Sequence, residues 1–503
     1  MQHRFASHTI RMLLLVLSGR PIATSQSLVQ SKKKENIPQL TATFTPGEEA
    51  NITAVPESFS AEVSKILATV NDQFDAEELR AMAVHQIGSP TLQIILQLEM
   101  SLSKKERKLR EKSGGTLLSK LTGLAEESDE PSADAMDIDA PNADDADAAS
   151  SGKNFFQNLL YDSIGSHLAE SMLRHAPKRD FNALYKKFLK TRMGSLARNE
   201  TAAFVVQRVL ERLPQPELAE ALSDIAPQVP GLVERSRVAV LRTLIECCRA
   251  KGVDMAEFVT ALKTAYNVPK QELLLKMLNL TPADLDPTRD VQIKARKDPR
   301  QLHGSLLAQA MIENGGELAE MVTDSILAQP LDTLLALCRH PSASHVIQRA
   351  MGAPPPAPAS PTRRKLLNML RGQWVNLALD TVASHIVDSA WYSPMNLRQS
   401  IAEELLKGEA ELRESFPGRA VWRNWGMDKF KTARRMWFAL GGADGLPEKK
   451  KKTAIELARE RHAKAKEEGA GTGANGVLGK RGPPGGRDYN KGPKKNRTME
   501  TEA

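Results

Sequence analysis

The chain has 503 residues, of which 41% are hydrophobic and 5% aromatic, and its net charge is +8. Its three cysteines, Cys247, Cys248 and Cys338, match neither a disulfide framework nor a metal-ligand pattern, which favours a reducing, intracellular compartment. No apolar segment approaches the length of a membrane span. The composition favours helix over sheet, and the basic charge favours a polyanionic partner, with nucleic acid first.

Residues 1–19 contain a short apolar run, MLLLVLS, that follows Arg4 and Arg11. The run superficially resembles a signal peptide. However, the letters before it, SHTIR, match a pattern that returns along the chain. We interpret residues 1–19 as the second helix of a partial helical repeat whose first helix is missing, and we therefore expect the chain to be truncated at its N-terminus.

The next segments alternate between polar and helical composition. Residues 20–58 are predicted to form a disordered loop, and residues 59–112 a helical repeat whose basic end fits phosphate contact and a solvated helix end equally well. Residues 113–153 are interpreted as an acidic disordered insert, because residues 126–148 carry ten acids and no Lys or Arg. This insert could repel RNA, dock a basic partner or do neither.

Residues 154–440 are expected to form a helical array with a C-terminal cap, because apolar residues recur there with the helical period. Trp422, Trp425 and Trp437 near its end are interpreted as the core of the cap, with an RNA-stacking surface as the alternative. Residues 441–503 are interpreted as a basic disordered tail. The cluster Lys449–Lys452 in this tail is of nuclear-import type.

A pentad of residues recurs along the chain. In Ser344-His345-Val346-Ile347-Gln348, the hydroxyl and the amide lie one turn apart on a helix, with the ring at the edge of the same face. We expect the three polar side chains to form one exposed strip, in which the hydroxyl and the amide contact a base edge and the ring stacks on a base. Eight copies begin at these residues: Ser7, Ser89, Ser166, Ala203, Val238, Ser305, Ser344 and Ser384.

The spacing of the pentads indicates stacked helical units. The last five copies start 35, 67, 39 and 40 residues apart. Because 67 is close to two periods, we expect a degenerate copy near Gln271–Asn279. A period in the upper thirties is typical of repeats that cannot bury their apolar face alone.

Several segments carry the pentads in a characteristic order: FASHTIRMLLLVLSG, IGSHLAESML, AFVVQRVLERL, HGSLLAQAMI, SASHVIQRAM and VASHIVDSAW, followed by GRAVWRNWGMDKFKTARRMW and GRDYNKGPKKNR. In this order they resemble the Pumilio-repeat family and, more narrowly, its nucleolar ribosome-assembly members. The resemblance implies an all-α fold, a curved right-handed α-solenoid of Pumilio-type helical repeats.

The resemblance also implies a function in the nucleolus. It implies an RNA-binding protein that binds small-subunit precursor rRNA and is required for its processing and for 40S subunit synthesis, by restraining the final endonucleolytic cleavage. The expected partners are this precursor rRNA and pre-ribosomal proteins, including the endonuclease. The chain is expected to be a monomer without cofactor, metal or membrane contact.

Carried over by resemblance, pentad positions 1 and 5 pair with a base edge and position 2 stacks. The candidate RNA-binding residues are Ser7, His8, Arg11, Ser89, Gln93, Ser166, His167, Glu170, Phe204, Gln207, Arg242, Ser305, Gln309, Ser344, His345, Gln348, Ser384 and His385. Arg11 could instead hold a phosphate, Pro90 is a poor stacker and Asp388 is unusual at position 5. Because three further copies are degenerate, we expect patchy base reading combined with recognition of RNA shape and phosphates.

An enzyme and a protein-interaction scaffold are the two other classes of protein to consider. An enzyme is not expected, because the sequence holds no zinc-protease motif, glycine-rich phosphate loop or nucleophile elbow. An armadillo- or HEAT-like protein-interaction scaffold is the alternative, since the same period allows it. RNA binding needs Ser, His, Gln, Arg and Lys on the inner face, whereas a protein scaffold needs apolar or Asn-rich grooves.

Overall fold

The computed structural model describes residues 1–20, 53–103, 106–107, 115–124, 154–285, 298–352 and 361–440. Every regular element in these residues is helical, which confirms the predicted all-α fold. We find no helix among them with the length and apolar character needed to span a membrane. The chain divides into a large unit, Met1–Arg434, and a small unit that begins at Arg435. Helix α29 (Arg434–Ala439) begins at this division.

Most helices of the large unit form groups of three, and in every group but the last the third helix carries a pentad. The groups are α2 (Glu57–Gln73), α3 (Ala76–Ala83) and α4 (Gly88–Met100); α9 (Lys178–Leu184) with its π-helical continuation Tyr185–Leu189, α10 (Met193–Arg198) and α11 (Ala202–Arg212); α12 (Gln215–Ile225), α13 (Val229–Glu234) and α14 (Ala239–Lys251); α15 (Ala256–Ala265), α16 (Lys270–Met277) and α18 (Pro299–Asn314); α19 (Gly316–Leu327), α20 (Leu331–Arg339) and α21 (Ala343–Ala350); α22 (Pro361–Met369), α23 (Trp374–Leu379) and α24 (Ser384–Ala390); and α25 (Met395–Lys407), α26 (Glu409–Glu414) and α27 (Phe416–Asn424). Outside these groups, α1 (Arg4–Leu17) and α8 (Gly165–His175) also carry pentads, and α28 (Met427–Thr432) follows the last group.

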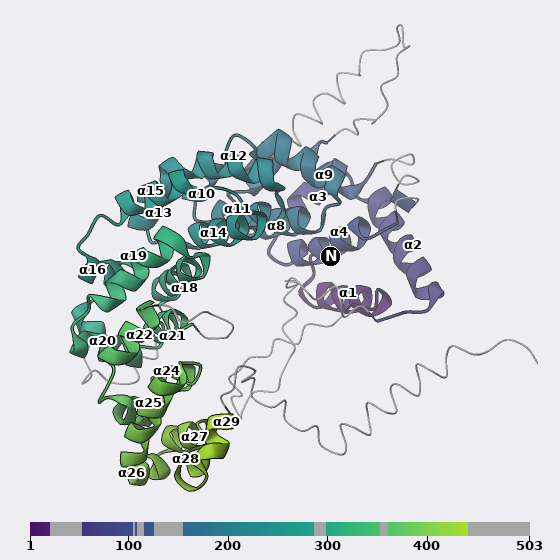
Figure 1. Cartoon of the computed structure of the whole chain (residues 1–503). Coiled ribbons are helices and arrows are strands. Elements are labelled where there is room, and N and C mark those ends of the chain that lie inside the picture. The colour runs from purple at the N-terminus through teal and green to yellow at the C-terminus, as the bar shows by residue number, and fades with distance from the viewer. Residues whose placement is uncertain are drawn as a thin grey trace, which may run out of the picture. The chain divides into compact units, whose positions relative to one another are not determined.

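The pentad helices pack against one another in chain order. Helix α1 packs on α4, α4 on α8 and α8 on α11, and the row continues through α14, α18, α21 and α24 to α27. Within the large unit this row bends, and the pentad helices lie along its inner side (Figure 1). This arrangement confirms the predicted solenoid of helical repeats.

Helices α14 and α18 are direct neighbours in the row, although their pentads start 67 residues apart. Helix α16, which covers most of residues 271–279, packs against α19 and α18 instead of joining the row between α14 and α18. The expectation of a degenerate pentad near Gln271–Asn279 is therefore wrong. The extra length is an insertion between α16 and α18, of which residues 286–297 lie outside the described residues.

Helix α6 (Leu117–Thr122) corrects the predicted boundary of the acidic insert at residue 113. A capping box between Thr116 and Ser119 begins this helix, and its leucines are buried. The N–H group of Leu117 donates a hydrogen bond of 3.0 Å to the Glu99 carboxylate. The start of the proposed insert is therefore part of the folded array. The acid-rich residues 126–148, most of the predicted loop, and the tail with Lys449–Lys452 lie outside the described residues.

The three tryptophans near the end of the array are buried. Trp425 and Trp437 are completely covered, and Trp422 exposes 4% of its surface. Trp425 Nε1 donates a hydrogen bond of 3.2 Å to the Val387 carbonyl oxygen on α24. The burial of Trp422 and Trp425 supports the interpretation of a capping core in the large unit, and the burial of each of the three excludes an exposed stacking surface at these residues.

Candidate nucleic-acid interface

Many pentad helices are capped at their N-terminus by a side chain that lies four residues before pentad position 1. Asp162 Oδ1 accepts hydrogen bonds from the N–H groups of Ile164 and Gly165 at 2.9 and 2.6 Å. Such a cap satisfies N–H groups that the helix itself leaves without a partner. Pairs of hydrogen bonds of the same kind are made by His85, Asn199, His340 and Asp380. Because the cap sets where each helix begins, it also sets the direction in which each pentad side chain points.

A small residue directly before the pentad lets the helix approach its neighbours closely. A Cβ atom on Gly165 would lie 2.4 Å from Leu159 Cδ1, and one on Gly304 would lie 2.0 Å from the Met277 carbonyl oxygen. The same place is filled by other buried small residues: Gly88, Ala202, Ala343 and Ala383. Sequence reasoning used neither the cap nor this small residue, although both are visible as a repeated pattern beside the pentads.

From α8 to α24 pentad positions 3 and 4 are buried in every copy, and position 2 is exposed where it carries a ring; in α1, His8 and Ile10 are half-buried and Thr9 is exposed. Positions 3 and 4 face the core, and Val346 and Ile347 are completely buried. Position 2 faces solvent: the side chain of His167 is 62% exposed, Phe204 is 55% exposed, and His345 is exposed as well. The row therefore presents a line of second-position side chains, as the sequence predicted for the stacking residues.

The serines at position 1 are buried, which contradicts the expected exposed strip. Ser344 Oγ donates a hydrogen bond of 3.3 Å to the Pro341 carbonyl oxygen in its own helical turn. Ser305 Oγ donates one of 2.6 Å to the Ser342 carbonyl oxygen of the next repeat in the row. The packed neighbouring helix covers position 1, so the prediction that the hydroxyl shares a solvent-facing strip with the ring is wrong. The buried serines are Ser7, Ser89, Ser166, Ser305, Ser344 and Ser384, with exposures between 0 and 6%.

Several side chains at position 5 are also engaged inside the row. Gln309 Nε2 donates a hydrogen bond of 3.1 Å to Ser305 Oγ, and the largely buried Gln93 bonds to Ser89 in the same way. Arg11 Nε donates to the Ser7 carbonyl oxygen at 3.3 Å, and burial lowers its pKa. In these copies the fifth residue stabilises its own helical turn in the structure.

In other copies the fifth residue has an acidic, basic or polar partner beyond its own pentad. Arg242 forms an ion pair of 2.8 Å with Glu246. Asp388 accepts a hydrogen bond of 2.9 Å from Asn424, and burial raises the pKa of its carboxyl group. Gln348 is half-buried beside the exposed His345, and it is the strongest candidate for reading a base edge.

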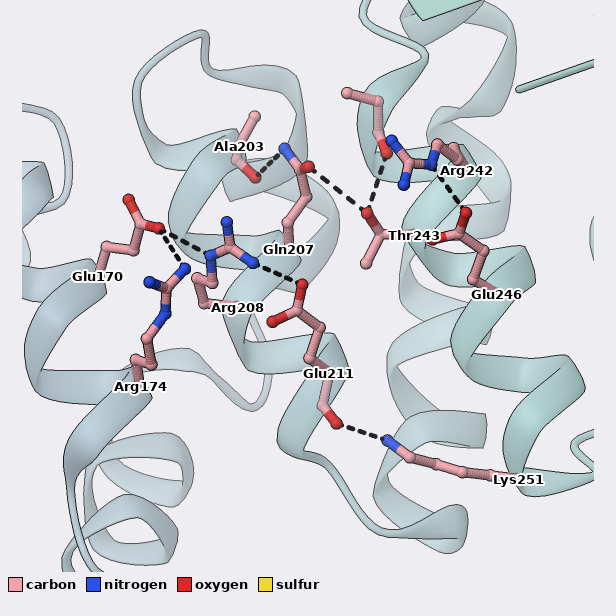
Figure 2. A network of polar contacts seen from close by, with 11 residues as sticks. Glu170, Arg174, Ala203, Gln207, Arg208, Glu211, Arg242, Thr243, Glu246 and Lys251 are labelled. Carbon is pink, nitrogen blue, oxygen red and sulfur yellow. Dashed lines mark hydrogen bonds and ion pairs between the residues drawn. The ribbon is translucent and has the colours of Figure 1, made fainter. Parts of the chain in front are cut away.

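A polar network joins α8, α11 and α14 (Figure 2). Glu170, the fifth pentad residue of α8, forms ion pairs with Arg208 Nε at 2.7 Å and Arg174 Nη2 at 3.3 Å. Arg208 also contacts Glu211 at 2.6 Å, and Thr243 Oγ1 on α14 donates a hydrogen bond of 3.4 Å to Gln207 Oε1. Glu170 is therefore engaged in the contact between α8 and α11, and its expected role at a base edge stays a prediction.

The network also shifts the pKa values of its members. Burial raises the pKa of the Glu170 carboxyl group, but the facing His167 and the two arginines outweigh burial, so the pKa is lowered. The Glu170 carboxylate raises the pKa of the His167 imidazole against the smaller effect of burial. The exposed ring of His167 lies with its Nδ1 4.0 Å from the Glu170 carboxylate, which two arginines contact.

Comparisons with known proteins agree with this geometry. Residues 1–420 match the family model described as "NOP9-like PUF repeat domain". Nucleolar protein 9 of Leptosphaeria maculans is 39% identical over 489 residues, which cover 93% of this chain and 65% of that protein. Nucleolar protein 9 of Emericella nidulans is 37% identical over 496 residues, which cover 95% of this chain and 67% of that protein. This chain thus spans about two thirds of the length of these relatives.

A solved structure supports the same fold. The structure of APUM23–GGAGUUGACGG superimposes with a TM-score of 0.61 over 86% of this chain and 74% of that chain. The two sequences are 19% identical, so the likeness concerns the helical repeat fold.

Proposed function

Because this chain belongs to the NOP9-like PUF repeat family, we propose that it is a nucleolar protein that binds RNA along its row of pentad helices. The finer function that we propose is supported by the similarity to Nucleolar protein 9. It binds the precursor rRNA of the small ribosomal subunit, and it is required for the processing of that RNA and for 40S subunit synthesis. It acts by binding rather than by catalysis, and it restrains the final endonucleolytic cleavage.

The line of exposed second-position rings is the observation that supports RNA binding. His345 and His385 lie at the same pentad position in neighbouring helices, and both are exposed although the flanking pentad residues are buried. A ring that served only packing would be covered by its neighbours. An exposed flat ring can stack on an unpaired base, and such a stack contributes about 1–3 kcal/mol per base.

The basic side chains on the pentad helices support RNA over a protein ligand. Arginines lie on the pentad helices of the row, including Arg208 on α11, Arg249 on α14 and Arg349 on α21. Arg249 and Arg349 both contact Glu313 of α18, at 3.1 and 2.9 Å. Histidine and arginine are the residue types that hold bases and phosphates. An armadillo-like scaffold would need apolar or Asn-rich grooves on this face.

The proposal is tested with a structured fragment of small-subunit precursor rRNA in a filter-binding assay over a series of salt concentrations. We expect an affinity that falls as salt rises, because bound phosphates release counterions. Joint substitution of His345→Ala and Gln348→Ala should weaken binding while helical content stays constant. His345→Phe, which keeps a flat ring, should retain most of the affinity.

The matched control is Leu331→Ala on the outer helix α20, where the side chain is 41% exposed. This substitution removes exposed apolar surface away from the row, so we expect unchanged affinity. An affinity for RNA that is absent or insensitive to salt would reject RNA binding. Normal affinity in the His345/Gln348 double variant would reject the pentad row as the binding surface.

The role in cleavage needs a separate experiment. The purified chain should associate with the rRNA-cleaving endonuclease or shield its RNA site, and it should slow cleavage of the precursor fragment. Cleavage at an unchanged rate with saturating chain would contradict the restraining role and leave RNA binding itself standing.

A further inference from the structure

The line of second-position rings is interrupted in the middle of the row. His167 and Phe204 form one pair on α8 and α11, and His345 and His385 form another on α21 and α24. Between these pairs, α14 carries Ala239 and α18 carries Leu306 at the same position, and both are half-buried. Neither side chain offers the flat π-face on which a base stacks.

The same two helices also begin differently from the four that carry rings. Each of α8, α11, α21 and α24 has a side-chain cap four residues before its pentad. Helix α14 has Glu234 four residues before its pentad, whose side chain makes no such pair of hydrogen bonds in the described residues, and it follows Ser236, whose φ is 56°. Helix α18 begins at Pro299, six residues before Ser305, and is capped by Asp298. In α14 and α18 the absence of a ring is thus accompanied by a different entrance to the helix.

The two ringless helices are full members of the row. Helix α11 packs on α14, α14 on α18 and α18 on α21, so an RNA strand that follows the row from one ring pair to the other must cross both. Their fifth pentad residues are held by other side chains, Arg242 by Glu246 and Gln309 by Ser305. The middle of the row therefore offers neither a stacking ring nor an uncommitted side chain at position 5.

We propose that this chain selects RNA with two short unpaired runs that stack on the His167–Phe204 pair and on the His345–His385 pair, separated by nucleotides whose bases are not stacked. This inference rests on the proposed function and defines the class of RNA that the row takes. At one base per helical repeat, the unstacked stretch above α14 and α18 is about two nucleotides long. The protein tolerates any base, or no base, in that stretch.

The test compares three RNA hexamers by fluorescence anisotropy with the full chain: UUUUUU, UUxxUU and xUUUUx, in which x is an abasic nucleotide. The wild-type chain should bind the first two equally, because the middle bases contribute no stack. It should bind xUUUUx more weakly, by roughly 5- to 150-fold for each stacked base that is lost. A clear preference for UUUUUU over UUxxUU in the wild-type chain would overturn the inference.

A gain-of-function variant tests the same point from the protein side. The joint substitution of Ala239→Phe and Leu306→Phe should make the row prefer UUUUUU over UUxxUU, because both middle bases then gain a ring. Ala239→Leu is the matched control, which adds apolar surface without a ring and should not discriminate between the two RNAs. A folded Phe double variant that still binds both RNAs equally would also overturn the inference.

The outcomes separate this inference from the proposed function. A wild-type chain that binds neither the precursor rRNA fragment nor any hexamer rejects RNA binding altogether. A chain that binds the fragment in a manner that depends on His345, but binds no hexamer or loses affinity when the central bases are removed, overturns only the two-run inference. Circular dichroism of each variant verifies that its helices are intact. If the Phe double variant does not fold, the affinities of the wild-type chain for UUUUUU and UUxxUU decide whether the two-run inference holds.

Discussion

Two contacts in the row, α8 with α11 and α24 with α27, occupy equivalent places but use different chemistry. In the first, Arg208 and Arg174 hold Glu170, and Arg212 Nη1 donates to the Leu173 carbonyl oxygen at 2.6 Å. The contact between α24 and α27 is made by aromatic rings. Neighbouring helices of the row are thus held together by either kind of contact.

The contact between α24 and α27 is built around Trp425. Its ring is completely buried and meets the edge of Trp391 at a centroid distance of 5.3 Å. Its Nε1 donates to the Val387 carbonyl oxygen. The packing of the two indole rings responds little to salt, whereas ion pairs weaken as salt rises. The two contacts should therefore lose stability under different solution conditions.

The largest effect is expected from Trp425→Ala. Removal of a buried indole from a packed site costs about 3–5 kcal/mol of unfolding free energy. Because repeats depend mainly on their neighbours, hydrogen exchange should accelerate in α23 to α28 and stay unchanged in α8 to α14. Equal acceleration in both regions would show that the two contacts belong to one cooperative unit.

A smaller loss is expected from Glu170→Gln. The substitution removes the charged acceptor that Arg174 and Arg208 share, and the loss of a partner in a largely buried charged contact costs roughly 1–3 kcal/mol. Urea denaturation measures this change, and hydrogen exchange should place it at α8 and α11. Glu211→Gln is the matched control, because this more exposed glutamate contacts only one of the two arginines, and it should cost less than about 1 kcal/mol. Equal losses in both variants would contradict a central role for Glu170.

The helix caps should affect both regions equally. Asp162→Ala before α8 and Asp380→Ala before α24 each remove a side chain that accepts two backbone N–H groups. Each should lower the unfolding free energy by about 1 kcal/mol, measured by thermal denaturation. The corresponding Asn variants keep an accepting oxygen and should be close to neutral. A much larger loss of unfolding free energy at only one of the two sites would mean that this side chain has a role beyond capping its helix.

The pH response is the smallest effect, and in acid solution, where Glu170 and Asp388 titrate, it should differ in sign between the two contacts. The pKa of Glu170 is lowered from its ordinary value of 4.5, so its stabilisation is present above pH 4.5 and is lost as the pH falls through the lowered pKa. The pKa of His167 is raised from 6.5, so its contribution is complete below pH 6.5 and is lost as the pH rises through the raised value. The contact between α8 and α11 should therefore be strongest in mildly acidic solution.

At the contact between α24 and α27, burial raises the pKa of Asp388 above its ordinary value of 3.8. Its protonation therefore favours the folded state, and the contact should gain stability as the pH falls through the raised pKa. Hydrogen exchange from pH 3.5 to pH 8, with correction for intrinsic rates, can follow both contacts in one sample. Parallel responses at the two contacts, or an unchanged response in Glu170→Gln, would contradict these assignments.

Much of the architecture was predictable because it depends on local periodicity. The recurring pentads predicted helices, a repeat array and the outward direction of position 2, and the structure confirms this for His167, Phe204, His345 and His385. Two further local signals, the cap before the pentad and the small residue next to it, were equally visible. They would have shown that the copies at Val238 and Ser305 begin differently. The assignment of individual residues to RNA contacts stays a prediction.

The sequence by itself determined the helical repeat and the residue in each pentad that points away from the core, because the turn of a helix places side chains at regular angles. Only the tertiary structure decided which partner each inward-facing side chain contacts. It buried the serines, and it placed Glu170 against Arg208, which lies 38 residues further along the chain. It also made α14 and α18 neighbours across an insertion, and it included α6 in the array. These outcomes depend on the partner helix across the interface, and the period of a single helix contains no information about that partner.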